Sequence, residues 1–155
     1  MTPLDQLLLL SGLSVLAVLL IGNRTVTGWN ATILYAAQGA ALVLMSGLGY
    51  GTIQSIESSL SFQVLGHVLR WRFDGLSWFF ALITIGAAFL ASWFAAGDWG
   101  QAYRRAGGSL RVFHTALALN VFTMLVLLAS GDLLTLFIGW ELVSWASFLI
   151  MALGS

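Results

Sequence analysis

The stretch from Leu133 to Leu153, LLTLFIGWELVSWASFLIMAL, most constrains the fold because it is apolar throughout except for one acid. A helix needs roughly 20 such residues to cross the hydrocarbon core of a bilayer. The acid, Glu141, lies eight residues after Leu133, which places it about 12 Å along the helix axis. An ionised carboxylate at that depth costs on the order of a few kcal/mol. We therefore expect Glu141 to be protonated, paired with a cation, or facing a hydrated cavity.

Two interpretations of Glu141 follow from this position. Acids inside membrane-spanning segments commonly take up and release protons, and we favour this role. The alternative is a carboxylic acid that holds two helices together through a hydrogen bond. The flanking Trp140 and Trp145 fit either interpretation, because indole rings can screen the acid from lipid or simply provide packing surface.

The composition predicts an integral membrane protein. Of the 155 residues, 59% are hydrophobic and 8% are charged, whereas a soluble domain carries about a quarter charged residues. The absence of cysteine excludes disulfides, thiolate metal sites and iron–sulfur ligation in this sequence. The net charge is zero and the six basic residues, all arginines, are scattered, so the charge pattern argues against nucleic-acid binding.

The apolar stretches predict an all-α integral membrane protein, with residues 1–155 forming a single membrane domain in the lipid bilayer. We expect five spanning helices at about 4–22, 31–50, 76–96, 111–129 and 133–153. The polar stretch at about 51–74, between the second and third spans, is expected to form a loop outside the bilayer. Its segment SFQVLGHVLRWRF splits about Gly66 and His67 into two short β-rich runs, which indicates a small hairpin or, alternatively, a surface helix.

Loop charge predicts the orientation. Cytoplasmic loops of membrane proteins carry an excess of arginine and lysine. Two arginines, Arg70 and Arg72, fall on the side of the hairpin, and four fall on the other side: Arg24, Arg104, Arg105 and Arg111. We therefore expect the N-terminus and the hairpin to lie outside the cell.

The two histidines are weaker candidates for function. His114 lies three residues after Arg111 on the expected fourth span, and an imidazole there could relay protons to Glu141. We favour the plainer interpretation, a histidine near the membrane surface that makes one hydrogen bond. His67 lies in the expected hairpin and is predicted to be solvated. A bis-histidine haem needs two histidines at matching depth, which these two do not offer, so we expect no haem.

Two aspartates are expected to cap helices. Asp74, in FDGLS, precedes the third span, and Asp132, in SGDLL, precedes the fifth. An acidic side chain just before an apolar run is typical of a helix N-cap, so neither aspartate requires a catalytic role.

Three motifs resemble the N-terminal third of the antiporter-like subunits of respiratory complex I: RFDGLSWFFALI, ASWFAAGDW and LLASGDLLTLFIGWELVSWASFLI. The Mrp-type cation/proton antiporters and the membrane arms of energy-converting hydrogenases share this resemblance. The most specific element is GWELVSWASFLI. The resemblance runs from the hairpin to the end of the chain, whereas the first two helices match only in hydropathy.

The resemblance implies a mechanism and shows a departure from it. In this family an acid on the fifth helix pairs with a lysine two helices later, and the pair drives proton movement. Glu141 matches that acid by its motif. The sequence contains no lysine, so the partner base is expected on another membrane subunit, or on a longer protein of which this chain is a fragment or truncated frame.

The expected function is therefore the N-terminal portion of an antiporter-like subunit, contributing to proton or Na⁺/H⁺ translocation. At most, the chain belongs to the proton-translocating part of an oxidoreductase complex, with no redox chemistry and no cofactor of its own. The expected location is a bacterial cytoplasmic membrane. The alternative is a non-catalytic scaffold or assembly subunit, and a quinone-binding subunit is a more distant third.

Overall fold

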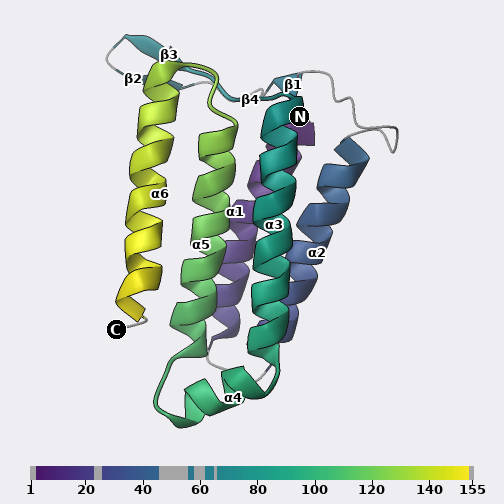
Figure 1. Cartoon of the computed structure of the whole chain (residues 1–155). Helices are drawn as coiled ribbons and strands as arrows, with labels where there is room; N and C mark the ends of the chain where they lie inside the picture. The colour runs from purple at the N-terminus through teal and green to yellow at the C-terminus, as the bar shows by residue number, and fades with distance from the viewer. Residues whose placement is uncertain (1–2, 23–25, 46–55, 58–61, 65, 154–155) are drawn as a thin grey trace.

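Long helices that run side by side dominate the chain (Figure 1). The computed structural model describes residues 3–22, 26–45, 56–57, 62–64 and 66–153. The long helices are α1 (Pro3–Ile21), α2 (Thr27–Met45), α3 (Gly75–Ala96), α5 (Leu110–Leu128) and α6 (Leu133–Leu153). The short helix α4 (Asp98–Arg105) crosses one end of the bundle, and the strands lie at the other (Figure 1). We call these the α4 end and the hairpin end.

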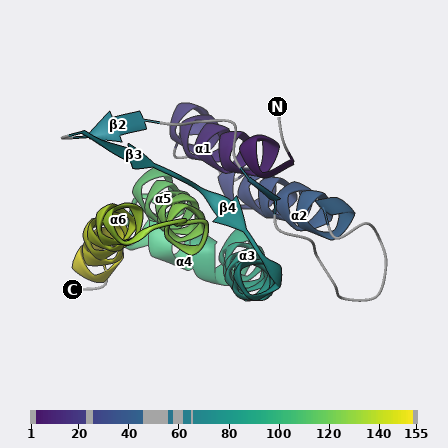
Figure 2. The same cartoon turned by 90° about the horizontal axis from the view of Figure 1, so that it is seen from above.

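Four of the long helices form the bundle, and α6 lies at its margin. Figure 2 shows α1, α2, α3 and α5 grouped together, with α6 beside α5. Correspondingly, α6 packs chiefly on α5, while α5 also contacts α1, α2 and α3. The apolar core includes the buried side chains of Tyr35, Leu42, Ile85, Val121 and Leu125. The marginal position leaves most of the surface of α6 uncovered by this chain.

The distribution of side chains is the reverse of that in a water-soluble bundle. Large apolar side chains face outward on every long helix, for example Leu20, Ile33, Leu90 and Phe137. Many polar side chains are instead buried: Asp5, Ser11, Ser14, Thr27, Thr32, Gln38, Ser92, His114, Thr123 and Thr135. An apolar exterior around a partly polar interior suits a surrounding of lipid, because lipid cannot hydrogen-bond to outward polar groups.

The number of spans is four by length and apolarity, rather than the five expected. Helices α1, α3, α5 and α6 meet both conditions among the described residues, and α2 does not. The polar residues of α2, including Asn30 and Gln38, lower its mean hydropathy. The helix also begins at Thr27 rather than Ala31. The last residues of the expected second span, 46–50, lie outside the described part of the chain.

The predicted hairpin is confirmed, and a second strand pair accompanies it. Strand β2 (Phe62–Val64) pairs antiparallel with β3 (His67–Leu69), with Val64 opposite His67. Gly66 in the turn has φ +83°, a left-handed conformation that glycine adopts without strain. Strand β1 (Ile56–Glu57) pairs antiparallel with β4 (Arg72–Phe73), which the sequence reasoning did not predict. Residues 51–55, 58–61 and 65 of the expected loop lie outside the described ranges.

Helix α4 lies between the expected spans 76–96 and 111–129, where the sequence analysis expected no helix. Its first turn contains Asp98 and its last turn contains Arg104 and Arg105, an order that complements the helix dipole. The indole of Trp99 stacks on the ring of Tyr103, with centroids 5.1 Å apart and planes inclined by 8°. These two residues are one turn apart, so the stacked rings stabilise the helix locally.

Both predicted N-caps are confirmed. The Ser77 amide donates to Asp74 Oδ1 at 2.9 Å, and the Thr135 amide donates to Asp132 Oδ1 at 2.7 Å. Each backbone hydrogen bond stabilises the ionised carboxylate and so lowers the pKa of that aspartate below its ordinary value of 3.8. Asp132 caps α6 and therefore helps to fix where the helix bearing Glu141 begins.

The cap at Asp74 predicts an acid-sensitive contribution to stability. Because its pKa is lower in the folded chain, the contribution is complete above 3.8 and is lost as the pH falls through the folded value. Asp74→Asn keeps a capping oxygen without a titration, so its unfolding midpoint should fall less than that of the wild type between about pH 6 and pH 3. Asp74→Ala should lose about 1 kcal/mol near neutrality. Thermal unfolding in detergent measures both effects, and equal acid sensitivity of Asp74→Asn and wild type would contradict the assignment.

Candidate functional site

The start of α6 and the turn before it are hydrogen-bonded to residues 70–72, on and beside β4 at the hairpin end. The Arg72 amide donates to the Ala129 carbonyl at 2.6 Å, and the Gly131 amide donates to the Arg70 carbonyl at 2.8 Å. The Arg70 amide also donates to Thr135 Oγ1 at 3.2 Å. These bonds hold the α5–α6 turn against the strands, so they set the direction in which α6 leaves the turn.

One face of α6 packs closely on α5. At Gly139, an added Cβ would lie 2.9 Å from the Cα of Leu127, so the two backbones touch almost directly. Two turns further along, Ser147 Oγ and Asn120 Oδ1 are hydrogen-bonded at 3.2 Å. Ala146 on the same face is 1% exposed. Small residues on this face allow the close approach.

Glu141 lies away from that packed face and is exposed. It follows Gly139 by two residues, which is about 200° around an α-helix. Its neighbours Trp140 and Trp145 are 65% and 68% exposed, so neither is covered by the rest of the chain. Within the described residues, no side chain hydrogen-bonds or ion-pairs with the carboxylate. The acid is therefore presented outward, away from the described part of the bundle.

His114 is placed quite differently. Its side chain is 0% exposed, and neither ring nitrogen has a hydrogen-bond partner among the described residues. Asn120 on α5 and Ser147 on α6 lie at the same height in the bundle, because their side chains are hydrogen-bonded to each other. His114 precedes Asn120 by six residues and Glu141 precedes Ser147 by six, in antiparallel helices, so about 18 Å separates the two groups along the bundle. The structure does not bring the two sequence-predicted site residues together.

Sequence reasoning missed the polar side chains buried among α1, α2 and α3. Gln38 Nε2 donates to Ser14 Oγ at 3.1 Å, and Thr32 Oγ1 bonds to Ser92 Oγ on α3 at 3.0 Å. The sequence pattern could have predicted them, because Thr32, Tyr35 and Gln38 recur at helical spacing in a mostly apolar segment. Such residues share one face of a helix.

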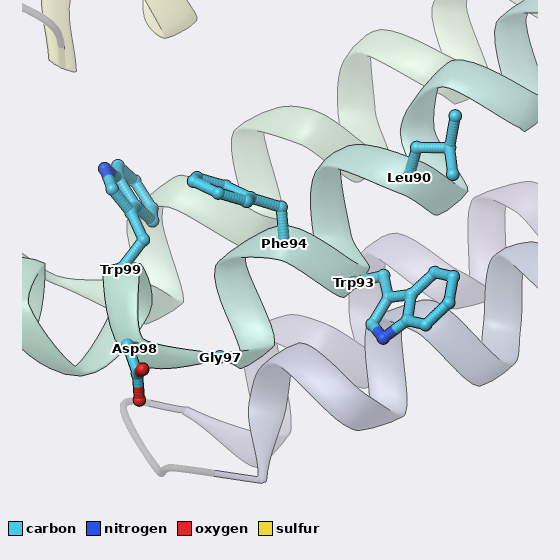
Figure 3. Close-up of a pocket in the computed structure, with 6 residues that line it drawn as sticks. All are labelled: Leu90, Trp93, Phe94, Gly97, Asp98 and Trp99. Carbon is cyan, nitrogen blue, oxygen red and sulfur yellow. The ribbon is translucent and has the colours of Figure 1, made fainter.

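A hollow of about 640 Å³ lies where α3 meets α4, lined by Leu90, Trp93, Phe94, Gly97, Asp98 and Trp99. Figure 3 shows that its single carboxylate, on Asp98, points away from the ring of Phe94. The hollow is open and at the α4 end, far from Glu141. Among the described residues, no group of three or more acidic or histidine side chains could hold a metal ion.

The comparisons with known proteins point to one kind of subunit. No family model matches the chain. NADH-ubiquinone oxidoreductase chain 5 of Ceratotherium simum is 26% identical over 133 residues, covering 86% of this chain and 20% of that protein. The Bos indicus protein of the same name is 28% identical over 131 residues, covering 84% of this chain and 19% of that protein.

Both proteins named NADH-ubiquinone oxidoreductase chain 5 are weak homologues of this chain. The similarity extends over most of the chain, so it includes more than the three motifs that carry the resemblance in sequence. The matched region spans about a fifth of the length of these curated relatives. Together with its apolar helices, this relationship supports a multi-pass membrane protein.

Proposed function

We propose that the chain forms part of an antiporter-like subunit and that Glu141 takes up and releases the transported proton. The observation that carries this proposal is the outward position of Glu141 on α6, at membrane depth and without a partner among the described residues. An acid left against lipid would be costly. Another helix therefore covers this face in the working assembly.

The covering helix supplies a cation, which we propose to be a lysine of another subunit or segment. The described arginines do not meet this need: Arg70 and Arg72 lie on or beside β4, and Arg104, Arg105 and Arg111 lie at the α4 end. An ammonium group beside Glu141 would keep the carboxylate ionised, and its removal would favour protonation. This alternation is what a proton-transfer site requires.

The proposed setting is a membrane complex related to respiratory complex I, to hydrogenase membrane arms or to Mrp-type antiporters, with H⁺ or Na⁺ as the transported ion. We propose a bacterial cytoplasmic membrane, with residues 1–155 as one membrane domain. The arginine distribution favours the α4 end as the cytoplasmic side, which puts the N-terminus and the hairpin end outside.

This proposal predicts that ion flux depends on the assembled complex. Vesicles containing the chain alone should show no proton or sodium flux above background, because Glu141 lacks its cation. Vesicles containing the complex should show flux, and the complex prepared without this chain should not. A pH-sensitive dye inside the vesicles measures the change. Undiminished proton flux in a complex that lacks the chain would contradict the proposal.

A further inference from the structure

The bundle of α1, α2, α3 and α5 buries polar atoms that have no partner in the described protein. Among them are Tyr35 Oη, Gln38 Oε1 and both ring nitrogens of His114. The three side chains are 1%, 0% and 0% exposed. Leaving a buried polar atom without a hydrogen bond costs about 1–3 kcal/mol. Atoms of this kind in a folded chain usually contact ordered water.

Polar side chains from three helices lie in one layer near the α4 end. An added Cβ on Gly28 would lie 2.8 Å from the Cα of Ala96, so α2 and α3 touch there. Ala96 and Leu110 line one small cavity, so the start of α5 lies at the same level. One turn deeper on α2, α3 and α5, respectively, lie Thr32, Ser92 and His114, all buried.

The polar groups continue from this layer to the middle of the bundle. Thr32 Oγ1 is hydrogen-bonded to Ser92 Oγ. Tyr35 and Gln38 follow Thr32 at successive turns of the same face of α2. Gln38 Nε2 then donates to Ser14 Oγ on α1. We call the series Thr32, Ser92, His114, Tyr35, Gln38 and Ser14 the polar row.

Toward the hairpin end, buried apolar side chains lie beside the row, and α1 also carries the buried Ser11 and Asp5 there. Leu42 follows Gln38 by one turn on α2, and Leu7 lies on α1 toward its N-terminal end. Both belong to the apolar core and are 0% exposed. A small cavity lies at the other end of the row, at α4.

The cavity at the α4 end has a volume of about 10 Å³ and is lined by Ala95, Ala96, Gly100, Gln101, Arg104 and Leu110. This is close to the volume that one water molecule needs. Gln101 and Arg104 are exposed, so polar side chains connect the cavity to the surface. The space is too small for a lipid chain or an organic ligand.

We propose that the polar row is a water-binding track that leads from the α4 end to the middle of the bundle. Water matches the chemistry of each unpartnered atom: it donates to Gln38 Oε1, accepts from Tyr35 Oη, and bonds to either nitrogen of His114. The track is separate from Glu141, which lies outside the bundle on α6. It gives the four-helix bundle a hydration path of its own, independent of the proposed role of the acid.

Substituted cysteines test the track in the full chain, whose natural sequence contains none. Gln38→Cys and His114→Cys report on the row, while Leu42→Cys and Leu125→Cys, equally buried in the apolar core, serve as matched controls. The chain is placed in lipid vesicles and treated from the α4 side with Ag⁺, a thiol-reactive cation small enough for a space of this size. The thiolate, which forms in contact with water, binds Ag⁺, so the row positions should react about tenfold faster or more. Equal rates at row and control positions would overturn the proposal.

A second measurement needs no substitution. In the unaltered chain labelled with ¹⁵N-histidine, magnetisation transfer from water reports on the two imidazoles separately in solid-state NMR. His67 is exposed and provides the reference signal. The track predicts clear transfer from water to the ring nitrogens of the buried His114. No transfer to His114, with normal transfer to His67, would show that the row is dry, even if the cysteine variants fail to fold.

Discussion

Replacement of Glu141 by glutamine is expected to lower proton uptake per turnover by about tenfold or more, while the complex assembles normally. Glutamine keeps the size and hydrogen bonding of the acid but cannot bind and release a proton. In the proposed site, a nearby cation keeps the carboxylate ionised. When that cation moves away, an uncompensated charge at this depth costs a few kcal/mol, so the carboxylate takes up a proton. The amide cannot perform this step.

The measurement is proton uptake in vesicles that contain wild-type or Glu141→Gln complex at equal assembled amounts. Ser144→Ala is the matched control, because Ser144 is exposed on the same helix and its hydroxyl bonds only to the Trp140 carbonyl of its own helix. It should pump at the wild-type rate. Glu141→Ala is a poorer test, since a lost hydrogen bond can itself impair folding. A scaffold role for Glu141 predicts near-normal pumping by the glutamine variant, and that result would refute proton transfer at this residue.

Replacement of Gly139 by leucine is expected to destabilise the contact between α5 and α6 by about 2–3 kcal/mol. A Cβ at this position meets the backbone of Leu127 at 2.9 Å, and the backbone cannot move aside as a flexible side chain can. The two helices must separate, which also weakens the hydrogen bond between Ser147 and Asn120. Because α6 packs chiefly on α5, few other contacts can compensate.

Gly86→Leu provides the control for this experiment. Gly86 also lies inside a long helix, but an added Cβ there meets no atom within 4 Å. Both substitutions gain about 1 kcal/mol of helix propensity, so their difference isolates the packing effect. Thermal unfolding in detergent and protease cleavage of α6 should show loss of stability for Gly139→Leu alone. Equal stability of the two variants would mean that the close approach of α5 and α6 is not required.

Local sequence determined most of the helical architecture. Apolar runs of spanning length predicted the long helices, and both capping aspartates lie where an acid precedes such a run. The hairpin about Gly66 followed from β-rich runs on either side of a turn residue. The two incorrect predictions, for α2 and α4, also have local causes in the sequence. Gln38 and Asn30 reduced the apolarity of α2, and helix α4 is too short and too polar to stand out as a helix in the sequence.

The tertiary structure alone decided which side of each helix is covered. The sequence of α6 places Glu141 at its depth in the membrane, but the exposure of the acid follows from the contact of Gly139 with Leu127 on a different helix. The buried polar row likewise depends on α1, α2, α3 and α5 meeting along particular faces. Depth is set by position within one helix, because its rise per residue is constant. Burial is set by the packing of distant segments, which no single stretch of sequence specifies.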